Sequence, residues 1–551
     1  MNQKNKRMTW NKRMTWSTIV VGSLLMATLS GCSGNSPQQK ASQEELQQHL
    51  ESQEGSTSLR RLVPEGKTVT LKAWRPTHSS IGTLMESWND TLFQRWMEEQ
   101  TGVHIDWITP VSGTEGDNLA MLISSGEYPD LFFDAGLVYP TGAYGLLKDG
   151  VVIDIAKHLD KLPNYKTELE RSSVRQIESY SDEGEMASLS SFTQDDVQDA
   201  TWYGILMRKD MLEKVNMEAP QTYDEWYDVL TAFKKAGLEK PYLLNSDGFP
   251  KLNMFIGGLG FGYMNYGGSV QPFYQVDGKI RYAPLEEGFR TYLEMMNKWY
   301  SEGLIDQDFL SLNSINAEFA AYPDPRTGSM VAPISVVNVI RELTPDKNVD
   351  YIAVPHPVVN KGDKIHVGTE SRLVRSGMQI SSKTKNLDLA LQWADLFYSP
   401  DVIHISNYGP DESYYEKLPD GTYRFNEKVY ANEDGFAAID MITSIADSPA
   451  VVVSNRTVTD PWLLEQAELY DSINDNAYVI SSSLTLNDEE SKTYNSVMTN
   501  IIDYVEEMQI KFIMGIEKFD KYDAFVERIR GMNVETAMAV YQKALDRYNS
   551  R

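Results

Sequence analysis

Alternating strand and helix patterns between residues 67 and 133 constrain the fold of this chain more than any other feature. Val69, Leu71 and Ala73 alternate with polar residues, which is the period-two pattern of a half-buried strand. Two further short apolar strand segments follow, and apolar residues at helical spacing lie between the strands. We therefore expect strands over residues 67–74, 103–107 and 131–133, and helices over residues 92–101 and 117–125. This succession indicates a mainly parallel sheet covered by helices.

The chain is long enough for more than one such unit. Its 551 residues exceed the ~150 residues of a typical domain, so two or three structural units are expected. The second half is rich in helix patterns, one of which begins with a capping box from Thr222 to Glu225. Other amphipathic helices are expected at residues 285–303, 386–399, 491–514, 520–530 and 534–548. Tryptophans on apolar helix stripes are expected in the core; they are Trp96, Trp226, Trp299 and Trp393. The fold class is α/β, with two lobes.

The composition fits a large folded protein and argues against anionic partners such as nucleic acid. Hydrophobic residues make up 41% and aromatic residues 11%, which is enough to bury a large core and excludes global disorder. The chain has 51 basic and 78 acidic residues, giving a net charge of −27. Such an acidic surface repels phosphate backbones and anionic lipid headgroups. We therefore expect no nucleic-acid partner and no electrostatic docking to a membrane.

The first 32 residues carry a separate signal. Five basic residues and no acidic residue precede position 32, and residues 17–29 are apolar or small, a length typical of a signal-peptide core. The segment ends Leu29-Ser30-Gly31-Cys32, which resembles a bacterial lipobox. We expect residues 1–31 to be removed as a lipoprotein signal peptide, and Cys32 to carry a diacyl lipid with palmitate as the membrane anchor. The alternative is an ordinary signal peptide with a chance cysteine at its end.

Residues 32–66 predict a flexible linker between the lipid and the folded body. They are rich in Ser, Gln, Glu and Gly and poor in aromatic residues, with at most one short helix at residues 42–51. Regular order is expected from Lys67. Loss of residues 1–31 changes the net charge from −27 to −32. The mature protein is expected on the extracellular face of the cell membrane, held by its lipid.

The sequence lacks the motifs of common catalytic and metal sites. None of its seven histidines lies in a His-Glu-x-x-His motif, and no Gly-x-Ser-x-Gly elbow occurs. The glycines of residues 257–262 are not followed by the Lys-Ser/Thr of a phosphate loop, and instead predict a loop whose backbone approaches something closely. With 78 acidic residues, a glycosidase pair of carboxylates does not rise above background. We expect no cofactor, no metal ion and no enzyme activity.

Several segments carry a family resemblance. They read Thr-Gly-Val-His-Ile-Asp-Trp at residues 101–107, Gly-Glu-Tyr-Pro-Asp at 126–130, Trp-Tyr-Gly-Ile at 202–205, Met-Arg-Lys-Asp at 207–210 and Lys-Phe-Ile-Met-Gly at 511–515. From the lipobox to the end, and in this order, the chain resembles the extracellular solute-binding lipoproteins of bacterial ABC carbohydrate importers, the LipO/LplA-like branch of family 1. The resemblance implies a monomer that binds an oligosaccharide and delivers it to the transmembrane subunits of an ABC permease.

The resemblance also implies a two-lobed periplasmic-binding-protein-like fold of type II. Each lobe would be a mainly parallel sheet flanked by helices, with a hinge between the lobes that lets them close around a solute. The expected boundaries are residues 67–195 plus about 366–460 for lobe 1, and about 196–365 plus 461–551 for lobe 2.

Two segments depart from the family pattern. Relatives often carry a loop like a calcium site after the helix that begins at Thr222, whereas residues 234–241 lack its spaced oxygen ligands. We therefore expect no calcium there. Residues 408–412 lack the second glycine of a family stretch, which puts the shape of that loop in doubt.

A sugar offers apolar C–H faces and a rim of hydroxyls, so its site needs aromatic rings and hydrogen-bonding groups at the carboxyl ends of strands. Trp74 and Asp134 each follow a predicted strand; the alternatives are that Trp74 is a core lid and Asp134 an ordinary loop acid. The resemblance adds Trp202 and Tyr203 at the crossover between lobes, and Tyr266 in the glycine-rich loop. The expected ligand-binding set is completed by Arg372 and Tyr414.

Two other functions stay open from the sequence. A cell-surface carbohydrate-active enzyme would cleave its sugar and would need an essential acid with a raised pKa. A receptor for a peptide or another solute would differ only in its ligand and partner. The sequence also leaves open whether the sugar is neutral or carries uronates, because a local Arg or Lys can offset the acidic field.

Overall fold

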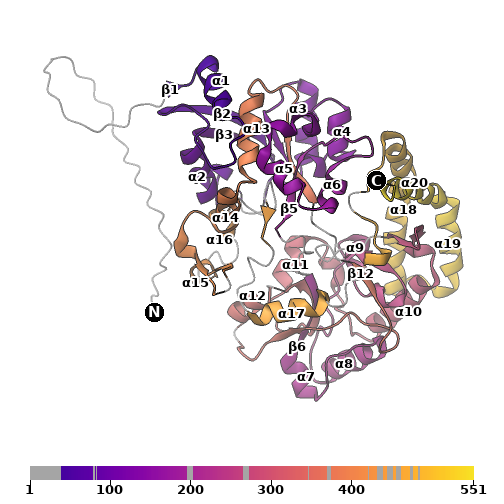
Figure 1. Ribbon diagram of the computed structural model, residues 1–551. Helices are drawn as coiled ribbons and strands as arrows, with labels where there is room; N and C mark the ends of the chain where they lie inside the picture. The colour runs from indigo at the N-terminus through magenta and orange to yellow at the C-terminus, as the bar shows by residue number, and fades with distance from the viewer. Residues whose placement is uncertain are drawn as a thin grey trace, which may run out of the picture.

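The computed structural model describes most of the chain. Described are residues 39–78, 81, 84–194, 203–264, 272–334, 336–344, 346–368, 374–419, 421–430, 438–443, 451–453, 461–471, 476–481 and 484–550. These residues form two α/β lobes with separate hydrophobic cores, one above the other in Figure 1. The first lobe comprises the described residues of 39–194 and 374–453, and the second lobe comprises those of 203–368 and 461–550.

A seven-stranded sheet lies at the centre of the first lobe. Its strands are β1 (Gln39–Lys40), β2 (Lys67–Trp74), β3 (Val103–Ile108), β4 (Leu131–Phe133), β5 (Leu189–Thr193), β13 (Val374–Ile380) and β16 (Val451–Val452). β2 pairs in parallel with β1, β3 and β4, and β5 pairs in parallel with β16. Only β13 runs against its neighbours, β4 and β5. The prediction of a mainly parallel sheet is therefore confirmed for this lobe.

Helices cover the faces of this sheet. They are α1 (Gln43–Glu51), α2 (Leu92–Thr101), α3 (Glu115–Ser125), α4 (Gly142–Lys148), α5 (Pro163–Leu169), α6 (Ser173–Ser179), α13 (Leu387–Leu396) and α14 (Pro400–Tyr408). The short helices α15 (Glu427–Tyr430) and α16 (Ala438–Ile442) pack instead with the hairpin of β14 (Tyr415–Lys417) and β15 (Tyr423–Phe425). Local chemistry sets their ends. The Thr91 hydroxyl accepts the Gln94 N–H at 3.1 Å to begin α2, and Gly102 ends it at φ 77°, where a side chain would strain the backbone.

The expected flexible linker is wrong for residues 39–66. β1 extends the large sheet, and α1 begins with a complete capping box at Ser42 and Glu45. Leu46 and Leu50 of α1 are buried in the first-lobe core, as are Leu62 and Val63 after it. Four buried apolar side chains are enough to order a polar segment, and composition alone hid them.

The second lobe has a smaller, antiparallel sheet, which corrects the prediction of a mainly parallel one. β6 (Tyr203–Arg208) is its central strand and pairs antiparallel with β10 (Ser329–Pro333) and β11 (Tyr351–Ala353). Two short pairs lie outside it: β7 (Gly262–Met264) runs parallel to β12 (His366–Gly368), and β8 (Phe273–Val276) forms a hairpin with β9 (Lys279–Tyr282). Because β12 pairs within the second lobe, the chain returns to the first lobe after Gly368.

Helices of very different length build most of the second-lobe core. They are α7 (Lys209–Val215), α8 (Tyr223–Lys235), α9 (Gly248–Leu252), α10 (Glu287–Ser301), α11 (Ile315–Ala321), α12 (Val336–Leu343), α17 (Pro461–Asp471), α18 (Asp488–Ile513), α19 (Tyr522–Gly531) and α20 (Val534–Tyr548). In Figure 1 the yellow helices α18, α19 and α20 lie together beside α10. The predicted capping box of α8 is present, and Trp226 and Trp299 are fully buried as expected. Over the described residues, none of the helices combines the length and apolarity that spanning a bilayer demands.

Candidate functional site

The described elements change lobe three times along the chain. The chain passes from β5 to β6 through residues 195–202, from β12 to β13 through residues 369–373, and from β16 to α17 through residues 454–460. β5 lies between β13 and β16 in the sheet, with Phe192 beside both Val374 and Val451. Since β13 runs antiparallel to β5 and β16 runs parallel to it, all three passages meet the first lobe at one edge. This arrangement is typical of two lobes that rotate about a shared junction.

Three predicted ligand residues lie outside the described residues, namely Trp202, Tyr266 and Arg372. Trp202 directly precedes β6 at the first passage. Tyr266 follows β7 and Arg372 follows β12, and these two strands pair in parallel with Met264 beside Gly368. The chain segments that carry Tyr266 and Arg372 therefore start from neighbouring residues at the second-lobe side of the junction.

Tyr203 is not a free aromatic face, because it lies in a buried polar cluster. Its hydroxyl donates to Glu318 Oε1 at 2.5 Å and lies 2.8 Å from the Tyr322 hydroxyl. The Lys251 ammonium donates to the same hydroxyl at 3.3 Å and lies 3.5 Å from Glu318 Oε2. Burial, together with the charge of Glu318, raises the pKa of Tyr203, and burial lowers the pKa of Lys251. We name Tyr203, Lys251, Glu318 and Tyr322 the junction cluster, which anchors the second-lobe end of the first passage.

An exposed aromatic residue that the sequence reasoning missed stands beside this cluster. Phe319 of α11 is 50% exposed, although its neighbours Glu318 and Tyr322 are buried. The Tyr322 ring meets the Phe319 ring edge-on, with 5.4 Å between centroids, which limits how the exposed ring can turn. In Figure 1, α11 lies on the side of the second lobe that is nearest to the first lobe. Glu318 and Tyr322 are four residues apart and therefore share the buried face of α11, whereas Phe319 lies on its outer face. This helical spacing is the sequence signal that could have identified Phe319.

Trp74 belongs to the core of the first lobe, as the alternative reading of its position expected. Its side chain is fully buried, and its indole N–H donates to Asn118 Oδ1 at 2.8 Å. It packs with Phe132 and Leu146 beneath the carboxyl ends of the strands. A ring with no exposed face cannot stack on a sugar in this structure, so Trp74 is removed from our candidate set.

The residues after Trp74 begin with a buried contact between a cation and two aromatic rings and then reach the surface at His78. The Arg75 guanidinium lies 4.2 Å from the ring centre of Trp88 and 5.6 Å from that of Phe133. His78 follows, with 36% of its side chain exposed, and its Nδ1 lies 3.4 Å from an Asp440 carboxylate oxygen. His78 is therefore partly exposed and Asp440 is half-buried, and both offer hydrogen-bonding groups close to the end of β2, the side on which α/β sheets bind ligands.

The two remaining candidates lie in different surroundings. Asp134 is half-buried directly after β4, in the left-handed conformation at φ 52°, and its backbone N–H donates to the Gly377 carbonyl of β13 at 3.1 Å. Tyr414 is half-buried against a separate aromatic cluster around Tyr408 and Phe425, and burial raises its pKa. Tyr414 therefore does not share surroundings with the junction cluster.

The glycine-rich loop approaches its own chain closely, as predicted. A Cβ at Gly258 would lie 2.0 Å from the Pro357 carbonyl oxygen, and one at Gly262 would lie 2.2 Å from Cβ of Tyr478. Tyr478 also stacks on His366 of β12, with ring centres 3.7 Å apart. These contacts fix β7 and β12 and hence the start of the segments that carry Tyr266 and Arg372.

Charged side chains in the described part of the chain pair with one another rather than gather around an ion. Among those residues, no three His, Cys, Asp or Glu side chains are arranged to hold a metal ion. Burial raises the pKa of the Asp395 carboxyl group to about 6. It is fully buried and accepts hydrogen bonds from Asn164 Nδ2 and the Tyr165 N–H, each at 2.9 Å, so it cannot touch a bound solute.

Comparison with known proteins gives one consistent family. Residues 79–403 match the family described as bacterial extracellular solute-binding protein. The fructooligosaccharide ABC transporter substrate-binding protein FusA of Streptococcus pneumoniae is 22% identical over 499 residues, 84% of this chain and 88% of FusA. The polygalacturonan/rhamnogalacturonan-binding protein YtcQ of Bacillus subtilis is 21% identical over 343 residues, 62% of this chain and 67% of YtcQ. An HMO-binding, ABC-transporter-associated solute-binding protein of Bifidobacterium longum infantis has the same fold, with a TM-score of 0.72 at 18% identity, over 87% of this chain and 99% of that one.

Proposed function

Because this chain belongs to the family of bacterial extracellular solute-binding proteins, we propose that it captures an oligosaccharide between its two lobes and delivers it to an ABC permease. The observation that carries the proposal is the meeting of all three passages at β13, β5 and β16, between lobes with separate cores. Such a junction supports closure of both lobes around a ligand, and the permease would then bind the closed form. The similarity to FusA, a fructooligosaccharide-binding protein that aligns with 84% of this chain, supports a sugar as that ligand.

The proposed binding groups come from both lobes. Phe319 would stack on the apolar face of a sugar ring, because its exposed ring is held from below by Tyr322. His78, Asp440 and Asp134 would exchange hydrogen bonds with hydroxyls from the first lobe. The residues carried over from the sequence are Trp202, Tyr266, Arg372 and Tyr414.

The charge of the sugar is the second part of the proposal. FusA is named for a neutral sugar, and YtcQ for polygalacturonan and rhamnogalacturonan, which contain uronates. The net charge of −32 that is expected after loss of residues 1–31 favours a neutral ligand through its long-range field. A neutral oligosaccharide is therefore the expected ligand, and an acidic one would require Arg372 or another cation in the site.

We propose release without cleavage, rather than catalysis. Glycoside hydrolysis needs a protonated carboxyl group that reaches the glycosidic oxygen. Asp395 has the raised pKa, but it is enclosed by Asn164 and Tyr165. Incubation of the protein with its sugar should leave the chain length of the sugar unchanged.

We also propose that Cys32 carries the lipid that holds the protein at the extracellular face of the membrane. The lipobox-like sequence Leu29-Ser30-Gly31-Cys32 supports this anchor. Replacement of Cys32 by Ala should move the protein from the membrane fraction to the medium. Retention of the Cys32→Ala protein in the membrane would contradict the anchor.

A thermal-shift screen with a panel of neutral and acidic oligosaccharides tests the function. A ligand at 100 times its Kd should raise the free energy of unfolding by about 2.7 kcal/mol, since it binds only the folded state. With the resulting ligand, Phe319→Ala should weaken binding, as should Trp202→Ala and Tyr266→Ala. Leu310→Ala is the matched control, because Leu310 is an exposed apolar residue of the same lobe. If no sugar binds, the function is wrong; if a sugar binds and all three aromatic variants keep its affinity, only the site is wrong.

A further inference from the structure

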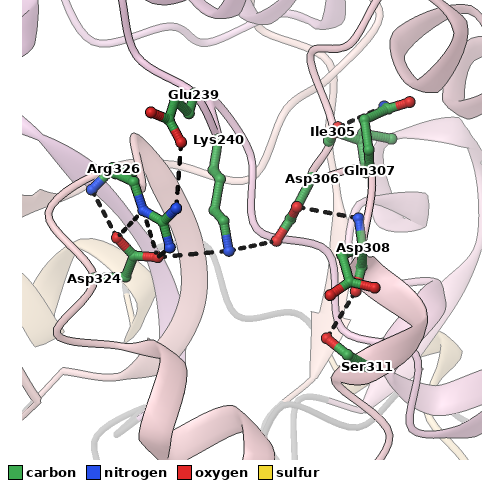
Figure 2. A network of polar contacts seen from close by, with 9 residues as sticks. All are labelled: Glu239, Lys240, Ile305, Asp306, Gln307, Asp308, Ser311, Asp324 and Arg326. Atoms are coloured by element: carbon green, nitrogen blue, oxygen red, sulfur yellow. Dashed lines mark hydrogen bonds and ion pairs between the residues drawn. The ribbon is translucent and has the colours of Figure 1, made fainter.

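An ion pair joins the two lobes at a place other than the three chain passages. The Arg547 Nε–H of α20, in the second lobe, donates to Asp182 Oδ2 of the first lobe at 2.7 Å. In Figure 1, α20 and the end of the chain lie beside α6. By contrast, Lys240 and Asp306, which lie 2.9 Å apart in the network of Figure 2, pair within the second lobe. The contact of Asp182 with Arg547, which we name the interlobe ion pair, therefore depends on how the lobes are placed relative to each other.

The second-lobe half of this pair is held in place by its own lobe. The other two nitrogens of the Arg547 guanidinium donate to Glu490 Oε1 at 2.6 Å and to Glu490 Oε2 at 2.7 Å. The Thr485 carbonyl accepts a further hydrogen bond from Arg547 at 3.1 Å. Glu490 belongs to the capping box that begins α18, and only 10% of its side chain is exposed. These contacts fix the orientation of the guanidinium, so its Nε–H is directed at the first lobe in advance.

The first-lobe half of the pair stands on a short turn that is fixed in the same way. The Ser181 hydroxyl accepts the Glu183 N–H at 3.2 Å and the Glu185 N–H at 3.1 Å. The Lys148 ammonium of α4 lies 3.0 Å from Glu183 and 2.6 Å from Glu185. Asp182 lies on this turn with 24% of its side chain exposed. Two fixed and partly buried charges lose less entropy on pairing than two long exposed side chains do, so this pair is stronger than a typical surface ion pair.

The interlobe ion pair lies to one side of the passages about which the lobes would rotate. Arg175 near the start of α6 donates to the Thr193 carbonyl at the junction end of β5. Ser179 at the end of α6 donates to Ser190 Oγ at 3.2 Å, so α6 runs back along β5 and away from the junction. The turn that carries Asp182 connects the end of α6 to the start of β5, which is the end remote from the passages.

This placement decides what a rotation of the lobes does to the pair. In Figure 1, α16 and α20 lie on opposite sides of β5. α16 carries Asp440, one of the proposed sugar contacts, so the sugar is expected on the side opposite to α20. A rotation about the junction that closes the lobes on the side of α16 opens them on the side of α20. Closure over a sugar would therefore pull Arg547 away from Asp182 and break the ion pair.

We propose that the interlobe ion pair holds the lobes in the arrangement that a sugar enters, and that its strength sets the sugar affinity of the protein. This inference rests on the proposed function. In the described arrangement the proposed contacts are accessible, since Phe319 is 50% exposed and 36% of the His78 side chain is exposed. The sugar has to break the ion pair as the lobes close, so the apparent affinity is lower than the affinity of the closed arrangement. Asp182 and Arg547 thus determine affinity without touching the sugar.

The test measures the Kd of Asp182→Asn and Asp182→Lys by titration calorimetry. The probe is the neutral oligosaccharide that gives the largest shift in the thermal-shift screen. Asp182→Asn should bind it about 2- to 5-fold more tightly than the native protein, the range that a pair of up to about 1 kcal/mol allows. Asp182→Lys should bind it more tightly still, because it places two positive charges across the lobes. Glu183→Gln is the matched control, since it removes the same charge from the same turn but pairs within the first lobe, and its Kd should equal that of the native protein.

Salt gives a second measurement on the same proteins. Added NaCl screens the partly exposed ion pair, so it should tighten sugar binding by the native protein and by Glu183→Gln, with a smaller effect on Asp182→Asn. If no sugar binds the native protein, the proposed function fails and this inference fails with it. If the native protein binds a sugar and Asp182→Asn has an equal Kd, the inference alone is overturned. Weaker binding by Asp182→Asn also overturns it, because the pair would then belong to the closed arrangement.

Discussion

Leu50→Ala should release the N-terminal segment of the body from the first lobe. Leu50 is 2% exposed and, with Leu46, attaches α1 to the core. Most other attachments of α1 are exposed polar contacts, such as Gln47 to Asp388 at 3.0 Å, which contribute little. One is buried: the Gln392 side-chain amide donates to the Leu50 carbonyl at 3.3 Å, and truncation of the Leu50 side chain leaves that backbone acceptor in place. A helix of nine residues is also too short to be stable alone, so α1 that leaves the core unfolds. The docking of α1 therefore depends on two leucine side chains.

The magnitude follows from the burial of that side chain. A Leu-to-Ala change in a core costs about 2–5 kcal/mol, and about 3 kcal/mol is expected here because α1 lies at the edge of the core and can relax. At about 1.4 kcal/mol per factor of ten, the population with α1 undocked should rise roughly 100-fold. Trypsin cleavage at Arg60 and Arg61, measured on the folded protein by mass spectrometry, should accelerate by a similar factor.

The control for this experiment is Leu137→Ala in the same lobe. Leu137 is 72% exposed, so its truncation should leave both stability and cleavage unchanged. Equal cleavage rates for Leu50→Ala and the native protein would refute the docking of α1. The flexible linker predicted for residues 32–66 would then be restored.

Docking of α1 also shortens the connection to the proposed lipid. Only residues 33–38 lie between Cys32 and β1, and six residues reach at most about 20 Å. A flexible linker to residue 66 would reach several times farther. A body held this close would meet its permease with the first lobe constrained, so a long insertion after residue 33 should alter transport more than sugar affinity.

Three further predictions concern single side chains in the two lobes. The pKa of Asp395 is about 6 in the folded protein, above its ordinary value of 3.8, so its contribution to stability is full below pH 3.8 and is lost as the pH rises through 6. Asp395→Asn should remove about 3 kcal/mol of this dependence in urea titrations from pH 4 to 7. Gly258→Ala should destabilise the protein by about 1–3 kcal/mol, because its Cβ would overlap the Pro357 carbonyl, whereas Gly531→Ala has open space and should not. Tyr203→Phe should lower the free energy of unfolding by about 1–3 kcal/mol, because it removes a hydrogen bond to the buried Glu318 carboxylate.

Short-range patterns predicted the helices and much of the core correctly. The capping box at Thr222 begins α8 as expected, and the apolar stripe of α10 is buried at Phe289, Leu293 and Met296. Trp226, Trp299 and Trp393 are buried, whereas Trp96 is only half-buried. These features depend on residues that lie within a few helical turns of one another, so the local sequence is enough to predict them.

Features that depend on distant partners could not be predicted in the same way. Residues 39–66 become ordered because α1 meets α13, more than 300 residues away in the chain, and because Leu62 joins the same core. The pairing of β6 with β10 depends on which strand arrives beside it, and the sequence does not state that order. For Trp74, a position at the end of a strand fits both a ring that stacks on a sugar and a core residue. Only the contact with Asn118, which lies 44 residues away in the chain, distinguishes the two.

Stability and sugar affinity should separate according to where a residue lies. Leu50 is attached to α13, and Lys240 is tied to Asp306 and Asp324, so both act within one lobe. A change confined to one lobe alters the folded state equally with and without ligand, and it should lower Tm without changing Kd. Phe319 is exposed, so its truncation costs little in the free protein and should change Kd with almost no change in Tm. Opposite behaviour, with Lys240→Met weakening sugar binding while Phe319→Ala only destabilises, would contradict the assignment of the ligand to the junction between the lobes.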